Sequence, residues 1–198
     1  MLFRSLAANF LVTVEALVGM IYQALATGLL FARFARPTAS IMFSRGAVVA
    51  PYNGNSALMF RIVNRRRNEI IELEAQVLLS HLVTDGSGGR VRRYYFLPLE
   101  RNKVTFFPLS WTIVHPIDES SPLAGKSSAQ LAADEAEILV LLTGIDETFE
   151  QTVHARTSYR SDEIEWNARF RSMFLQSDSS TRVAVDITRV HDTEPAPL

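Results

Sequence analysis

The hydrophobic pattern of the chain changes character once, near Pro37. Residues 10–32 form an almost unbroken apolar run in which only Glu15 and Gln23 are strongly polar. At about 1.5 Å of rise per residue, a helix of this length crosses a hydrocarbon core of roughly 30 Å. Proline has no amide hydrogen and clashes inside a helix, so Pro37 is expected to end this helix. The pattern therefore predicts one transmembrane helix within residues 1–37.

Beyond Pro37 the chain is divided into short segments rich in β-branched and aromatic residues, with turn-forming residues between them. Only Ser127–Glu137 favours a helix, because its serines can cap an Ala-rich stretch. Many short strands with one helical insert are typical of an immunoglobulin-like β-sandwich. We expect a mainly β domain over residues 38–192 and a disordered tail over residues 193–198. The predicted strands are residues 40–44, 47–51, 56–65, 69–84, 91–99, 106–114, 137–142, 148–159, 165–170 and 182–190.

The charges that flank the apolar run predict its orientation. Arg33, Arg36 and Arg45 follow the run, and only Arg4 precedes it. By the positive-inside rule the β domain should be cytoplasmic and the chain should reside in the cell membrane. A cleaved secretory signal is the main alternative, because Ala24-Leu25-Ala26 resembles a cleavage site. However, the apolar core of a signal usually has only about 7 to 15 residues.

Glu15 and Gln23 belong to a set of residues that lie four positions apart. Successive members would drift by only about 40° around a helix, so they form one slowly winding stripe. The set consists of Glu15, Gly19, Gln23, Thr27 and Phe31. A carboxylate in the membrane is costly unless it faces protein or water. The stripe therefore predicts that the helix faces a bundle or an aqueous pore, although Glu15 satisfying a neighbouring backbone group or hydroxyl remains an alternative.

Composition and motifs argue against several functions. With 20 basic and 21 acidic residues, the net charge of −1 gives no general attraction for nucleic acid. The absence of cysteine removes disulfides and thiolate metal sites. We find no nucleophile, phosphate-loop or metalloprotease motif, so neither an enzyme nor a cofactor is expected. The four histidines are expected to be structural, and Asp146, Glu147 and Glu150 are expected to form an exposed acidic loop.

A series of segments, taken in order, resembles inward-rectifier potassium channels, particularly their prokaryotic branch. The resemblance extends from about Leu6 to His191. The segments that carry it are Leu29–Pro37, Ile41–Ser44, Ala47–Gly54, Leu58–Asn64, Ser110–Leu123, Gly144–Thr148, Gln151–Tyr159 and Asp162–Trp166.

The resemblance implies a homotetramer in which each chain gives an inner pore helix and a cytoplasmic domain. By position, Gly19 resembles the hinge of the inner helix and Phe31 the constriction where the helices cross. Gln23 stands where an acid controls rectification in strong rectifiers. Because Gln23 is not an acid, strong block by polyamines is not expected.

The resemblance also implies roles for residues of the cytoplasmic domain. Glu72 falls where the family carries an acid of the cytoplasmic pore, and Gly144 and Ile145 begin a loop, residues 144–151, that girdles this pore. Arginines at the membrane face would meet phosphoinositide headgroups, so membrane lipids, including anionic phospholipids, are expected partners. Potassium would be the permeant ion, because rings of acids concentrate cations. These arginines are Arg33, Arg36, Arg65, Arg66 and Arg67.

The sequence departs from the family in one large respect. A conducting member needs an outer helix, a pore helix and a filter of the Thr-Val/Ile-Gly-Tyr/Phe-Gly kind, and none of these occurs here. The chain is therefore expected to be the C-terminal part of a channel that does not conduct alone, or else a regulatory subunit. A membrane-anchored immunoglobulin-like binding module is the rival from another class, but it does not explain the polar stripe. A cytosolic hydrolase would need a nucleophile motif.

Overall fold

The computed structural model describes residues 5–34, 40–65, 69–107, 109–175 and 184–197. The chain divides into two compact units, Met1–Pro37 and Thr38–Leu198. The first unit contains helix α1, Leu6–Phe34, and the second contains every strand that the structure describes. Predicted positions Arg36, Pro37, Arg66 and Arg67 lie outside the described residues.

Helix α1 is long and apolar enough to cross a membrane. Its 29 residues include a span from Leu6 to Arg33 that carries few charges and is not buried inside the structure. Large apolar side chains such as Phe10, Leu17 and Leu29 are more than half exposed. In water this surface would be unfavourable by about 25 cal/mol per Å², so the helix requires a lipid or protein environment.

The first sheet of the domain is built around strand β3, which pairs with β1, β2 and β7. Strand β10 adds to β2 in a parallel pairing, whereas the other pairings of this sheet are antiparallel. The strands are β1 (Ile41–Phe43), β2 (Ala47–Tyr52), β3 (Asn55–Asn64), β7 (Ser110–Ile117) and β10 (Ile164–Trp166).

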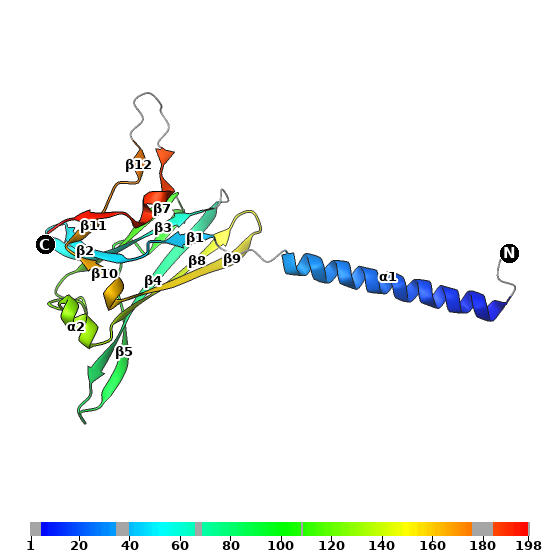
Figure 1. Cartoon of the computed structure of the whole chain (residues 1–198), viewed down its shortest axis with the longest axis horizontal. Coiled ribbons are helices and arrows are strands. Elements are labelled where there is room, and N and C mark those ends of the chain that lie inside the picture. Colours follow the sequence, from blue (N-terminus) through cyan, green and yellow to red (C-terminus); the bar gives the residue numbers. More distant parts are fainter. Residues whose placement is uncertain (1–4, 35–39, 66–68, 108, 176–183, 198) are drawn as a thin grey trace. The chain divides into compact units, whose positions relative to one another are not determined.

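The second sheet is built around strand β4, which is 15 residues long. Its order is β5-β4-β8-β9, with β6 also paired to β4. The far half of β4 extends with β5 as a two-stranded arm beyond the rest of the sheet (Figure 1). The strands are β4 (Ile70–Thr84), β5 (Arg90–Phe96), β6 (Lys103–Phe106), β8 (Glu137–Asp146) and β9 (Gln151–Arg160).

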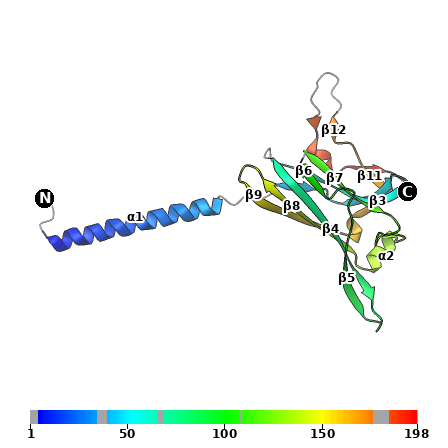
Figure 2. The same cartoon turned by 180° about the vertical axis from the view of Figure 1, so that it is seen from behind.

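Short elements complete the domain, and they are visible from both sides in Figures 1 and 2. Helix α2 (Ser128–Ala133) begins at Ser127, whose side chain accepts a hydrogen bond from the backbone N–H of Gln130 while the Gln130 side chain returns one to Ser127. The other elements are 3₁₀ helix η1 (Ser161–Glu163), the pair β11 (Ala168–Phe170) and β14 (Thr193–Pro195), the pair β12 (Phe174–Leu175) and β13 (Ala184–Val185), and 3₁₀ helix η2 (Ile187–His191).

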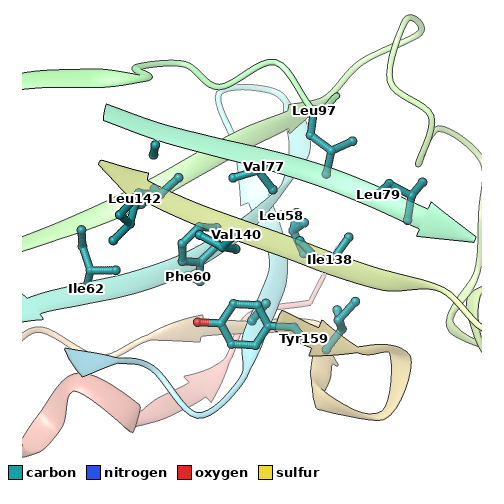
Figure 3. Close-up of a cluster of buried hydrophobic side chains, with 14 of the residues drawn as sticks. Leu58, Phe60, Ile62, Val77, Leu79, Leu97, Ile138, Val140, Leu142 and Tyr159 are labelled. Carbon is teal, nitrogen blue, oxygen red and sulfur yellow. The ribbon is translucent and has the colours of Figure 1, made fainter. Parts of the chain in front are cut away.

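The two sheets enclose one main apolar core (Figure 3). Alternate residues of β3, β4 and β8 face inward, and Tyr159 of β9 closes the core from the side. The Tyr159 ring lies 5.5 Å from that of Phe60, and its hydroxyl donates to the backbone oxygen of Ser44 at 3.1 Å. Burial raises the Tyr159 pKa to about 12. The hydrogen bond from Tyr159 to Ser44 links β9 of the second sheet to the segment that follows β1.

The structure confirms the predicted β-sandwich and corrects several of the predicted elements. The predicted strand 106–114 is divided, since β6 ends at Phe106 and β7 begins at Ser110, and the predicted strand 165–170 is divided between β10 and β11. The alternating segment 182–190 is not one strand: β13 ends at Val185 and η2 begins at Ile187. Asp186 accepts hydrogen bonds from both the N–H and the hydroxyl of Thr188, which favours a helical turn over continued extension. The tail over residues 193–198 was predicted to be disordered, but Thr193–Pro195 pairs with β11.

His115 is a buried histidine whose ring nitrogens both have partners. Nδ1 lies 2.6 Å from the backbone oxygen of Pro98, which can only accept, so Nδ1 carries the proton. Nε2 then accepts from the Ser121 hydroxyl at 2.7 Å. Burial lowers the pKa values of His115, His81 and His191. These rings therefore resist protonation in the folded protein.

The domain should lose stability as the pH falls below about 6.5, the pKa of an unfolded histidine. In that window the unfolded chain binds more protons than the folded chain, which favours unfolding by up to about 1.4 kcal/mol per pH unit for each extra proton. We expect urea unfolding of the detergent-solubilised chain between pH 7.5 and 5.5 to show this slope, and His115→Gln to reduce it. A matched control, the exposed His154→Gln, should retain it; an unchanged slope in His115→Gln would refute the assignment.

Candidate functional site

The predicted polar stripe lies on the surface of helix α1. No other described residue of the first unit covers it. Glu15, Gly19 and Gln23 are exposed, and Phe31 is 71% exposed. No atom outside the helix lies within 4 Å of a Cβ built at Gly19. The roles that the resemblance implies for these residues stay predictions.

One end of the sandwich gathers the predicted residues of the β domain. Main-chain hydrogen bonds join Arg65 to Ser40, Asn64 to Leu109, and Glu147 to Glu69 at this end. Ser40 lies six residues beyond Phe34 in the sequence, so this is the end at which the polypeptide enters the domain from the helix. The Arg65 side chain is exposed there, and Arg33 is exposed in the last turn of α1.

Glu72 lies in a β-bulge of strand β4. The pairing of β4 with β8 shifts between Ile71 and Glu74, so that β4 contains one residue more than β8 over this stretch. Glu72 takes a left-handed conformation with a φ of 53°, which is uncommon for a residue other than glycine. Its carboxylate forms an ion pair with Lys103 of β6 and raises the Lys103 pKa.

Gly144 is buried where strand β8 passes the bulge. A Cβ at this position would lie 2.8 Å from Cγ2 of Ile70 and 3.0 Å from Cδ1 of Leu73. Ile145 pairs with Ile71 in the neighbouring strand. The structure therefore brings Glu72, Gly144 and Ile145 together at one end of the second sheet.

The predicted loop 144–151 is shorter in the structure. Residues 144–146 belong to β8, Gln151 begins β9, and only residues 147–150 form the turn. Asp146 was predicted to be exposed but is fully buried. Its carboxylate accepts from the backbone N–H of Thr148 at 2.9 Å, so it stabilises the turn from inside. Glu147 and Glu150 are exposed as predicted.

Lys103 and Glu74 are the residues near this site that sequence reasoning missed. Glu74 is directly opposite Lys103 in the β4–β6 pairing and opposite Thr143 in the β4–β8 pairing. Alternation would have placed Glu72 and Glu74 on one face, but nothing in the sequence indicates that β6 returns to β4. The described residues, this site included, contain no group of three or more Asp, Glu or His side chains that could hold a metal ion.

Together these features describe a chain in which one apolar helix, long enough to cross a membrane, precedes a β-sandwich domain. A family model described as the inward rectifier potassium channel C-terminal domain matches residues 41–198. The chain belongs to the inward-rectifier potassium channel family. Members are membrane proteins, and their C-terminal domain is cytoplasmic, so the β domain lies in the cytoplasm and α1 is the membrane segment.

Individual relatives match most of this chain. It is 41% identical over 185 residues to the inward rectifier potassium channel Kirbac3.1 of Paramagnetospirillum magnetotacticum, with 93% of this chain and 62% of that protein covered. It is 31% identical over 207 residues to inward rectifier potassium channel 18 of Homo sapiens, with 97% and 46% covered. It is 31% identical over 197 residues to inward rectifier potassium channel 4 of Mesocricetus auratus, with 92% and 42% covered. The chain thus spans about three fifths or less of the length of these relatives.

Gly144→Ala should destabilise the domain, because the added methyl group collides with Ile70 and Leu73 beside the bulge. Overpacking of this kind costs about 1–3 kcal/mol. The measurement is urea unfolding of the full chain in detergent, followed by tryptophan fluorescence. Gly86→Ala is the matched control, since nothing lies within 4 Å of its Cβ position, and it should change stability by less than about 1 kcal/mol. Equal stability of the two variants would contradict a close approach of β8 to the bulge.

Proposed function

We propose that this chain supplies the inner pore helix and the cytoplasmic pore and gating domain of a homotetrameric potassium channel. Family membership supports the channel function, and the order of an apolar helix followed by a β-sandwich supports the assignment of the two parts. The relatives whose names describe inward rectifier potassium channels are longer than this chain. We propose that a filter-bearing segment must be joined to it for conduction.

The observation that carries this proposal is the polar stripe on helix α1. Glu15 and Gln23 are the only strongly polar residues of an apolar run, residues 10–32, whose large exposed side chains suit lipid. A carboxylate facing hydrocarbon costs several kcal/mol, so a single helix of this kind is unstable in a bilayer. Four copies can turn the stripe toward a shared aqueous axis and leave the leucines for lipid. In this arrangement Gly19 allows bending and Phe31 narrows the path.

The end of the β domain that contains the β4 bulge supports a continuation of the aqueous path from the helices into the domain. Glu72, Gly144 and Ile145 lie together at the end where the polypeptide enters from α1. Four copies of Glu72 around the axis would form an acidic ring that attracts cations. Close packing of Gly144 against Ile70 and Leu73 would keep this part of the wall rigid.

Potassium flux provides the test of the channel function. The chain alone in liposomes should give the flux of empty liposomes, because its sequence contains no filter. A chimera that joins the filter-bearing N-terminal part of Kirbac3.1 to residues 6–198 should restore flux that barium blocks. Cross-linking of the chimera in detergent should give a ladder that ends at four copies. A tetrameric chimera without flux would contradict the proposed pore role, and a monomer or dimer would contradict the assembly.

We also propose that arginines at the membrane face bind anionic lipid headgroups. Arg33 and Arg65 are exposed, and Arg65 lies beside the entry point of the chain at Ser40. Guanidinium groups bind phosphates through two parallel hydrogen bonds, which lysine cannot reproduce. All but two of the 20 basic residues in this sequence are arginine.

Replacing Arg65, Arg66 and Arg67 together by Gln should weaken binding of the membrane-inserted protein to phosphoinositide vesicles. Each charge near an anionic surface contributes about 1 kcal/mol, so the triple variant should lose at least tenfold in affinity. Vesicle co-flotation at about 0.15 M salt measures this effect. Arg90→Gln, which alters an arginine of the exposed β5 arm, is the control for a general loss of charge. Equal affinity of the triple variant and the native chain would refute the lipid contact.

A further inference from the structure

The β-bulge turns the Glu72 carboxylate toward a lysine of the neighbouring strand. In a regular strand Glu72 would follow the alternation of β4, but the extra residue at the bulge re-aims its side chain. The ammonium of Lys103, on β6, meets the Glu72 carboxylate directly. Both side chains are partly exposed, at 39% for Glu72 and 49% for Lys103, so ions in solution can reach the pair.

Glu74 is a second carboxylate near the same ammonium group. It pairs directly with Lys103 across β4 and β6, and cross-strand partners project from the same face of a sheet. Leu73 and Val104 pair beside them, and Leu73 is buried in the core, so Glu74 and Lys103 project from the opposite, outer face. Both acids raise the Lys103 pKa, Glu72 more strongly than Glu74. The group holds two negative charges and one positive charge in each chain.

We infer that Lys103 sets the charge of the cytoplasmic cation path, because it pairs with Glu72 and lies across the strands from Glu74. This inference rests on the proposed function, which places Glu72 at the wall of that path. Lys103 halves the negative charge that the two acids supply in each of the four chains. The ring that the acids of four chains would form therefore attracts cations more weakly than its carboxylates alone would. Removing the Lys103 ammonium from each chain restores the full attraction.

The chemistry of lysine suits this role. Its ammonium is a compact point charge on a flexible stem, so it can pair with one carboxylate and still attract a second without the planar geometry that arginine requires. Lys103 is one of only two lysines in the chain. The bulge keeps Glu72 in the left-handed region, which a residue other than glycine adopts only where the surrounding structure holds it.

The first arm of the test measures local charge and does not need a conducting channel. Binding of Mn²⁺ to the purified chain in detergent is followed by electron paramagnetic resonance, because carboxylates are ligands that Mn²⁺ accepts. Lys103→Met should tighten the binding by roughly fivefold, which corresponds to the upper range for one partly exposed charge pair. Adding Glu72→Gln to Lys103→Met should abolish the gain. Arg101→Met removes the same charge two residues away and should leave the affinity unchanged.

The second arm measures potassium flux through the Kirbac3.1 chimera. At about 10 mM ionic strength, Lys103→Met should raise flux about two- to fivefold over the unsubstituted chimera, and Arg101→Met should not. At about 1 M salt the screening length is near 3 Å, so the difference between Lys103→Met and the unsubstituted chimera should vanish. This salt dependence separates an electrostatic effect from a change of pore shape.

The outcomes distinguish this inference from the proposed function. Unchanged Mn²⁺ affinity in Lys103→Met would overturn the inference, whatever the flux. A gain in Mn²⁺ affinity together with unchanged low-salt flux in a conducting chimera would show that the acids lie off the cation path, which also overturns it. A chimera that assembles but does not conduct would contradict the proposed function, and the Mn²⁺ result would still decide whether Lys103 neutralises the two acids.

Discussion

Two stretches of strand β4 bury side chains of opposite parity in the same core. Along Leu73, Ala75, Val77 and Leu79 it contributes every second residue to the core. At its beginning, Ile70 must also be buried, although it has the opposite parity from Leu73. One strand with a regular pleat cannot satisfy both requirements, because successive side chains point to opposite faces. The bulge between Ile71 and Glu74 resolves the conflict by adding one residue.

The arrangement of the site follows from this bulge. The extra residue leaves Glu72 with a left-handed backbone and turns it toward β6. Strand β8 must then approach the bulge closely, and only a residue without a side chain fits between Ile70 and Leu73. Gly144 meets that need, while Asp146, two residues later, uses its buried carboxylate to close the turn into β9. Packing in the core thus determines where the charges of the site lie.

Most of the architecture could be predicted from sequence because it depends on local patterns. The apolar run of α1, the strand-like segments and the serine cap of α2 are all signals within one stretch of chain. Errors arose where a local hydrogen bond or a distant contact decides the structure. Asp186 turns an alternating segment into a 3₁₀ helix, and β11 holds a tail whose composition suggests disorder. The pairing of Glu72 with Lys103 joins residues 31 positions apart in the sequence, through a strand of only four residues.

The helix and the domain place opposite requirements on their surroundings. The domain encloses its apolar residues between two sheets and needs no partner for its core. Helix α1 buries none of its apolar span within the structure and carries a carboxylate at Glu15. Lipid can cover the leucines but not the carboxylate, and water can solvate the carboxylate but not the leucines. An assembly with both a lipid-facing and a water-facing surface would satisfy the whole helix. For this reason the physical argument for oligomerisation rests on α1, and the domain contributes the charges and the close packing that such an assembly would bring around one axis.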